Sequence, residues 1–85
     1  MSPLMNAPDR LSHLVCNDEG FIFDTSTGES YVANPAAIQI LRGLQEGQEE
    51  RDIVADLTLR FLVELDDARR DVAEFIGRLK LLQLI

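Results

Sequence analysis

Two residues with the chemistry of a catalytic pair, His13 and Cys16, lie close together near the start of the chain. Nucleophilic catalysis by a cysteine requires a base next to the thiol and a third group that orients the base. In an extended segment, however, side chains at these two positions point to opposite faces. His13 is the only histidine and Cys16 the only cysteine, so they make neither a disulfide nor a closed zinc site. We interpret them as a half-buried histidine and a small core thiol.

Acidic residues occur in adjacent pairs, which in other settings perform acid–base chemistry. The pairs are Asp18-Glu19, Glu49-Glu50 and Asp66-Asp67. Each lies at a predicted turn or helix start, where solvation and the helix dipole account for it. The glycines are too dispersed for a phosphate-binding loop or a dinucleotide fingerprint. The sequence therefore predicts no catalytic site, no metal site and no cofactor.

Length and charge narrow the class of protein. The chain has 85 residues, 46% of them hydrophobic, and a formal charge of −7 at pH 7. This length holds one small core, and the apolar share predicts that it folds. An acidic balance argues against nucleic acid, because nucleic-acid affinity comes largely from Lys and Arg that neutralise phosphates. A lone cysteine and the lack of a membrane-length apolar run indicate a cytoplasmic protein without a membrane partner.

The predicted elements change from strands to helices along the chain. Residues 1–10 contain Pro3 and Pro8 and are expected to form a flexible lead-in. Strands are predicted at 11–16, 21–23 and 29–33, separated by turn-rich segments. Helices are predicted at about 35–45, at 49–62 and from a cap at Asp66 almost to the end. Asn34-Pro35 starts the first helix, since Asn caps well and Pro lacks an N–H to leave unpaired.

This order predicts an α+β fold over residues 11–85, with a three-stranded antiparallel meander followed by three helices, winged-helix-like in outline. The helices cover one face of the sheet. The third strand is its outer strand and has a free edge.

Two surfaces remain that can bind a partner. The first is the edge of the third strand, whose unpaired backbone groups can accept an added peptide strand. Its residues are Ser30, Tyr31, Val32 and Ala33. The second is a flank of the last helix, where helical spacing groups Arg69, Ala73, Ile76, Gly77 and Lys80. Glycine at position 77 lowers the stability of the helix relative to alanine, and one explanation is that another backbone approaches closely there. The alternative is that this flank is solvated and the glycine is merely tolerated.

Several segments together resemble the PqqD family. They are Gly20-Phe21-Ile22-Phe23-Asp24, Ser26-Thr27-Gly28-Glu29, Val32-Ala33-Asn34-Pro35-Ala36-Ala37, Ile40-Leu41 with Leu44, and the last helix with Asp71-Val72, Phe75-Ile76, Leu79 and Leu82 to Ile85. The resemblance covers nearly all of residues 11–85.

The resemblance implies a RiPP recognition element, a non-catalytic peptide chaperone with a fold related to winged helices. Such a domain binds the leader of a ribosomally made precursor peptide as a fourth strand, against the third strand and third helix. It presents the leader to a modifying enzyme, which is a radical SAM protein in pyrroloquinoline quinone (PQQ) biosynthesis. Carried onto this chain, the leader lies on the strand edge and helix flank defined above.

Two departures from the family pattern leave the pathway open. The third strand lacks the second aromatic residue common in lasso-peptide relatives, and Ala33 stands where a larger aliphatic residue often precedes the Asn. The sequence does not distinguish three pathways, which are PQQ assembly, the modification of another peptide and a diverged role.

Two functions other than peptide binding are also consistent with the sequence. A winged-helix DNA-binding module would use the last helix in the major groove, although acids interrupt its bases. A dimerisation module would pair the exposed strand with its twin, so the chain is expected to be a monomer or a homodimer.

Overall fold

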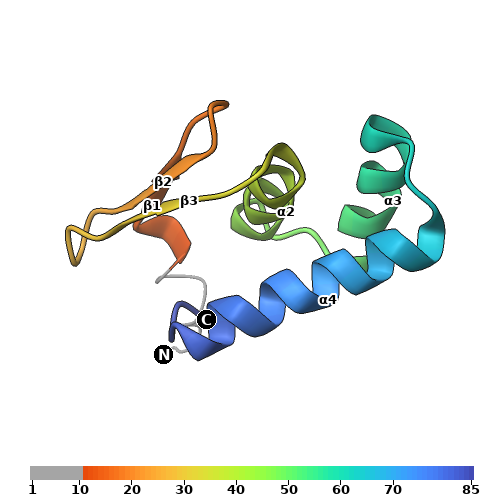
Figure 1. Cartoon of the computed structure of the whole chain (residues 1–85). Helices are drawn as coiled ribbons and strands as arrows, with labels where there is room; N and C mark the ends of the chain where they lie inside the picture. The colour runs from red at the N-terminus through yellow and green to blue at the C-terminus, as the bar shows by residue number, and fades with distance from the viewer. Residues whose placement is uncertain (1–10) are drawn as a thin grey trace.

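A computed structural model describes residues 11–85 and shows a small sheet followed by three helices (Figure 1). The strands are β1 (Leu14–Cys16), β2 (Phe21–Asp24) and β3 (Ser30–Val32), antiparallel and in the order β1-β2-β3. The helices are α2 (Pro35–Gln45), α3 (Glu50–Phe61) and α4 (Leu65–Leu81). The predicted α+β fold is confirmed. The predicted lead-in at residues 1–10 lies outside the described residues.

Short polar side chains form the two turns of the meander. Asn17 Oδ1 accepts hydrogen bonds from the N–H groups of Glu19 and Phe21, at 3.0 and 3.1 Å. Asp24 Oδ1 accepts from the N–H and hydroxyl of Ser26, at 2.9 and 2.6 Å. These side chains satisfy backbone donors that the ladder cannot reach. The turns therefore set the strand register from local sequence.

The first helix begins as predicted, at Asn34-Pro35. Asn34 Oδ1 accepts a 2.8 Å hydrogen bond from the N–H of Ala37, and Pro35 is the first helical residue. This cap turns the chain from the end of β3 directly into α2.

Two predicted boundaries are wrong. Leu11 and Ser12 are helical, so the first strand begins only at Leu14. The Gln45 side-chain amide donates to the carbonyl oxygens of Leu11 and Leu14, at 3.0 and 2.8 Å, and holds this segment in a local turn against α2.

The second wrong boundary concerns α4, which begins at Leu65 with Glu64 in the cap position. Asp66 lies in the first turn, where it pairs with Arg69 instead of capping the helix. Its charge is favourable there as well, because it lies near the positive end of the helix dipole.

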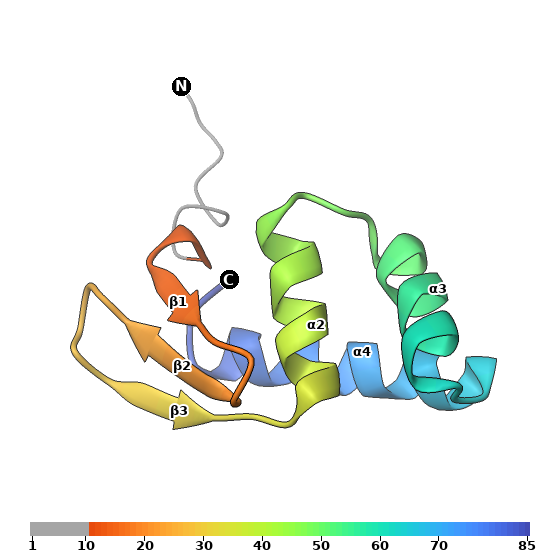
Figure 2. The same ribbon diagram turned by 90° about the horizontal axis from the view of Figure 1, so that it is seen from above.

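Two hydrophobic clusters meet at α2. One joins the sheet to the C-terminal half of α4 and consists of Leu11, Leu14, Ile22, Ile38, Leu41, Leu79 and Leu84. The other joins the three helices and consists of Ile40, Ile53, Val54, Leu57, Ala68 and Val72. Helix α4 is the longest element and runs from beneath α3, past α2, to beneath the sheet (Figures 1 and 2). One helix thus touches both halves of the molecule.

Candidate functional site

The free edge of the sheet is β3. The backbones of Glu29 and Ala33 bond to the β2 side, through the Glu29 carbonyl at 2.8 Å and the Ala33 N–H at 2.7 Å. In an antiparallel ladder, residues that bond to the neighbouring strand alternate with residues whose N–H and C=O point away. Ser30 and Val32, on either side of Tyr31, therefore direct their backbone groups to the open edge. Within the described part of the chain, no element pairs with that edge.

A groove of about 370 Å³ lies between β3 and the end of α4. Its floor is the core itself, with Leu14, Ile22, Leu41, Leu79 and Leu84. Its walls are Tyr31, Val32, Ala33, Asn34, Ala37, Phe75, Arg78 and Leu82. Apart from Asn34, Arg78 and the Tyr31 hydroxyl, these side chains are apolar, so the groove can take apolar side chains out of water.

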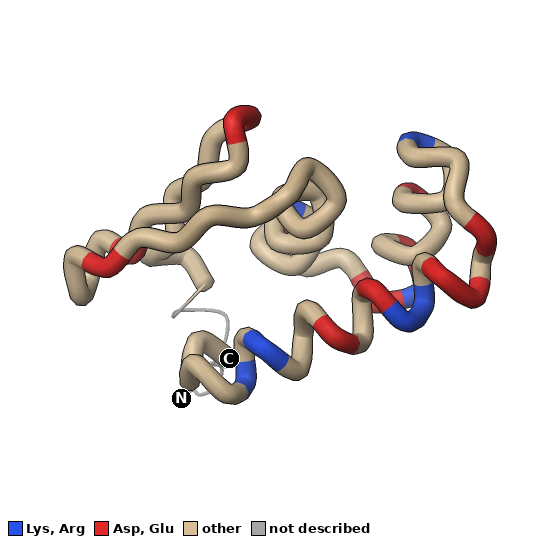
Figure 3. Tube along the Cα trace, in the orientation of Figure 1, with Lys and Arg blue, Asp and Glu red and all other residues tan. Residues whose placement is uncertain are grey.

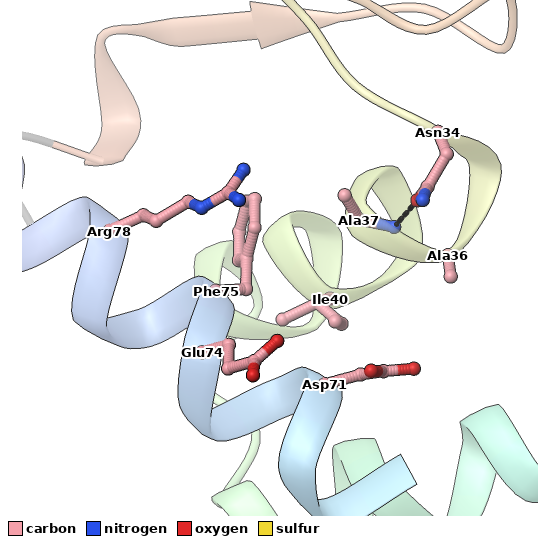
Figure 4. Close-up of a pocket in the computed structure, with 8 residues that line it drawn as sticks. All are labelled: Asn34, Ala36, Ala37, Ile40, Asp71, Glu74, Phe75 and Arg78. Atoms are coloured by element: carbon pink, nitrogen blue, oxygen red, sulfur yellow. Dashed lines mark hydrogen bonds between the residues drawn. The ribbon is translucent and has the colours of Figure 1, made fainter. Parts of the chain in front are cut away.

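A second hollow continues this groove toward the start of α2 (Figure 4). The two share Asn34, Ala37, Phe75 and Arg78. In Figure 4 the Arg78 side chain and the Phe75 ring both project from α4 toward α2, while Asp71 and Glu74 project at the other end of the hollow. The combined surface follows β3 from Tyr31 onward and then passes between α2 and α4.

The charged groups of this surface are available to a ligand. Arg78, Asp71 and Glu74 make no ion pair with any described residue, whereas Arg69 and Arg70 pair with acids of their own helix. Acids and bases alternate along α4, and no basic stripe runs along it (Figure 3). The groove therefore has one positive group near its middle and two negative groups at one end.

The turn before β3 is held by an ionised carboxylate. Asp24 is the single buried charged residue among residues 11–85, at 1% exposure. The hydroxyl and N–H of Ser26 both donate to it and lower the pKa of Asp24 below its usual 3.8. Hydrogen bonds to the charged form of an acid favour that form. Asp24 thus keeps its charge at neutral pH and anchors the β2–β3 turn.

Three of the four strand residues predicted to bind a peptide, Tyr31, Val32 and Ala33, line the groove. The fourth, Ser30, lies in β3 at the same edge but does not line the groove. The role of all four in binding stays a prediction.

The five helix residues predicted with them do not line the groove. Arg69 and Ala73 line a separate hollow against α3, and Ile76 packs on the three-helix cluster. Gly77 has open space where a Cβ would lie, and Lys80 is exposed. Their role in binding stays a prediction.

The flank of α4 that faces β3 carries other residues. Asp71, Phe75, Arg78 and Leu82 follow one another at helical spacing and line the groove or its continuation. Apolar residues at helical spacing put Phe75 and Leu82 on one face of α4 with Ala68, Val72 and Leu79, and the sequence alone therefore predicts that they pack in the core. One feature of the sequence indicates a second contact. The apolar face of α4 is longer than α2 and α3, so its last turns pack against an element other than these two helices.

No group of three or more His, Cys, Asp or Glu side chains among residues 11–85 is arranged to hold a metal ion. None of the helices described is both long and apolar enough to cross a membrane.

Comparison with known proteins identifies relatives of this groove-bearing fold. No curated protein matches the chain. A solved structure described as lasso peptide synthetase B1 complexed with the leader peptide is 32% identical, with a TM-score of 0.66. The match covers 79% of this chain and 80% of that one. The family model for coenzyme PQQ synthesis protein D matches residues 19–85. The match extends from the β1–β2 turn to the last residue, and the chain therefore belongs to the PqqD family.

Proposed function

We propose that the chain binds the leader segment of a ribosomally made precursor peptide by strand addition along β3 and presents it to a modifying enzyme. Domains of this family are non-catalytic peptide-binding modules. The observation that carries the proposal is the open backbone edge of β3 beside an apolar groove. An added strand bonds to the outward groups of Ser30 and Val32, which supplies affinity independent of side chains.

The groove indicates which side chains such a leader carries. Side chains of an added strand alternate between the two faces of the sheet, so every second one points into the groove. Those that meet Phe75, Leu79 and Leu82 are apolar, because a polar group placed there loses its water. A side chain that reaches Arg78 is acidic, since Arg78 has no partner among the described residues.

The class of the modifying enzyme is part of the proposal. The family model carries the name of a coenzyme PQQ synthesis protein, and the solved relative is a lasso peptide synthetase. We favour a radical SAM partner, which the sequence resemblance implies, and a lasso-peptide enzyme is the alternative. A precursor gene beside a radical SAM gene favours the first, and one beside a lasso-peptide enzyme gene favours the second.

Backbone amide chemical shifts test the binding mode. The 15N-labelled chain is titrated with a synthetic leader from the neighbouring precursor gene, and a scrambled leader of equal composition is the control. We expect large shifts at Ser30–Val32 and along the α4 flank from Phe75 to Leu82. Shifts confined to α3 and the start of α4 reject strand addition at β3.

A further inference from the structure

The outer face of the sheet, on the side away from the core, is an exposed apolar patch. Val15, Phe21, Phe23 and Val32 are exposed by 58, 54, 46 and 80%. Val15 lies opposite Phe23, and Phe21 lies opposite Val32, so the four side chains form two cross-strand pairs on one face. A patch this apolar on so small a sheet marks an interaction surface. The groove lies on the inner face of the sheet, so the proposed leader binding assigns no role to this outer patch.

The exposed charges in the turns beside this patch that have no ion-pair partner are negative. Residues 11–41 contain four acids and no Lys or Arg. Of these acids, Asp18 pairs with Arg42 of α2 at 2.9 Å and Asp24 is buried, which leaves Glu19 and Glu29. Glu19 and Glu29 lie in the turns at opposite ends of the sheet, and neither makes an ion pair with a described residue. A second copy of the sheet would bring acids against acids with no base from this segment to pair them. The complementary partner is an apolar surface bordered by Lys and Arg.

The patch continues into the groove edge. Val32 belongs to the outer face and also lines the groove. A leader strand added at β3 extends the sheet, and its outward side chains lie beside Val32 on the same face. A protein that docks on the patch therefore contacts the chain and the bound leader together.

We propose that the outer sheet face, formed by Val15, Phe21, Phe23 and Val32, is the docking surface for the modifying enzyme, through an apolar enzyme patch with a cationic border. The inference rests on the proposed leader binding. Because the bound leader adds to the docking surface, the leader raises the affinity of the chain for the enzyme, and the enzyme raises its affinity for the leader by the same factor.

The test uses the full chain, the synthetic leader and the purified enzyme encoded beside the precursor gene. The variant carries Val15→Thr and Phe23→Thr, which keep strand propensity, remove apolar surface and lie outside the groove. The control carries Leu59→Gln and Leu62→Asn at the α3–α4 corner, where the exposed fractions are 76 and 89%. Asn tolerates the left-handed backbone of Leu62.

We expect the sheet-face variant to bind leader as the wild type does and to bind enzyme at least about tenfold more weakly, as loss of an aromatic anchor does. The control keeps both affinities. The affinity of the wild-type chain for the enzyme should fall as salt is added. Glu19→Lys should also lower this affinity, because it replaces a negative charge at the border of the patch by a positive one.

Three results overturn the docking proposal. The first is unchanged enzyme affinity in the sheet-face variant. The second is a wild-type dimer in sedimentation that the sheet-face variant abolishes, which assigns the face to a second copy. The third is a shift of the Val15, Phe21 and Phe23 amides when residues 1–10 are deleted, which assigns it to that segment. Leader binding measured without enzyme reports on the proposed function separately.

Discussion

The N–H of Ala33 donates a 2.7 Å hydrogen bond to the carbonyl of Gly20, and the two backbones touch where β3 leaves the sheet. Gly20 has a φ of +99°, and a Cβ there would collide with the Ala33 carbonyl oxygen. This contact sets the position of the open edge relative to α2. Glycine is required at this position for both its conformation and its lack of a side chain.

Gly20→Ala is expected to lower the free energy of unfolding by about 3 kcal/mol, because left-handed strain and a backbone collision add. Gly28→Ala is the matched control, with a φ of +82° but no atom within 4 Å of the added Cβ. It should cost only about 1 kcal/mol. Urea unfolding measures both, and equal losses contradict the close approach.

Val32→Pro tests whether the open edge binds the leader. The N–H of Val32 points away from β2, so proline removes no bond of the existing ladder and is tolerated on an edge strand. We expect leader affinity to fall by about tenfold, since one backbone hydrogen bond and the best edge geometry are lost. Val32→Thr keeps the N–H and the branched shape and should bind nearly as the wild type. Calorimetric titration compares them, and equal affinity of the two variants contradicts strand addition.

Charge reversal at two arginines distinguishes the two flanks of α4. Arg78 lines the groove, whereas Arg69 lies in the hollow against α3 and pairs with Asp66 at 3.7 Å. Arg78→Glu is expected to weaken binding of an acidic leader by about tenfold or more, with a smaller loss at high salt. Arg69→Glu tests the flank predicted from helical spacing. A larger loss for Arg69→Glu restores that flank as the site.

Two helical glycines differ in what surrounds them. At Gly77 an added Cβ meets nothing within 4 Å, so Gly77→Ala should raise the free energy of unfolding by about 1 kcal/mol through helix propensity. At Gly43 the Cβ would lie 2.8 Å from both Gln48 Oε1 and Ile53 Cγ1, so Gly43→Ala should lower it despite the same propensity gain. Thermal unfolding of the pair measures the signs, and destabilisation by Gly77→Ala would mean that another backbone approaches it.

Much of the fold was predictable because its signals are local. Asn34-Pro35 starts α2 through one side-chain bond and one missing N–H, and Asp24 closes its turn with a neighbour two residues away. The start of β1 was not predictable in this way. It depends on Gln45, whose amide reaches Leu11 and Leu14 from the far end of α2.

The strand half of the candidate site was predictable, and the helix half was not. An edge strand follows from the order of a meander, so Tyr31, Val32 and Ala33 could be placed from sequence. Helical spacing identifies which residues of α4 share a face, but it does not say what each face meets. That depends on where α4 passes from α3 to the sheet, and this passage puts Arg69 beside α3 and Arg78 beside β3.

Acid should loosen the turn that precedes the binding edge. Ser26 lowers the pKa of Asp24 in the folded chain below the usual value of 3.8, which the unfolded chain keeps. A depressed folded pKa stabilises the fold above the unfolded pKa, and this stabilisation is lost as the pH falls from 3.8 through the lower folded pKa. Asp24→Asn removes the titrating group while keeping an oxygen acceptor for the Ser26 N–H. Between about pH 6 and about pH 3, the variant should lose less stability in urea unfolding than the wild type. A wild-type loss no larger than that of Asp24→Asn would mean that the ionised carboxylate does not hold the turn.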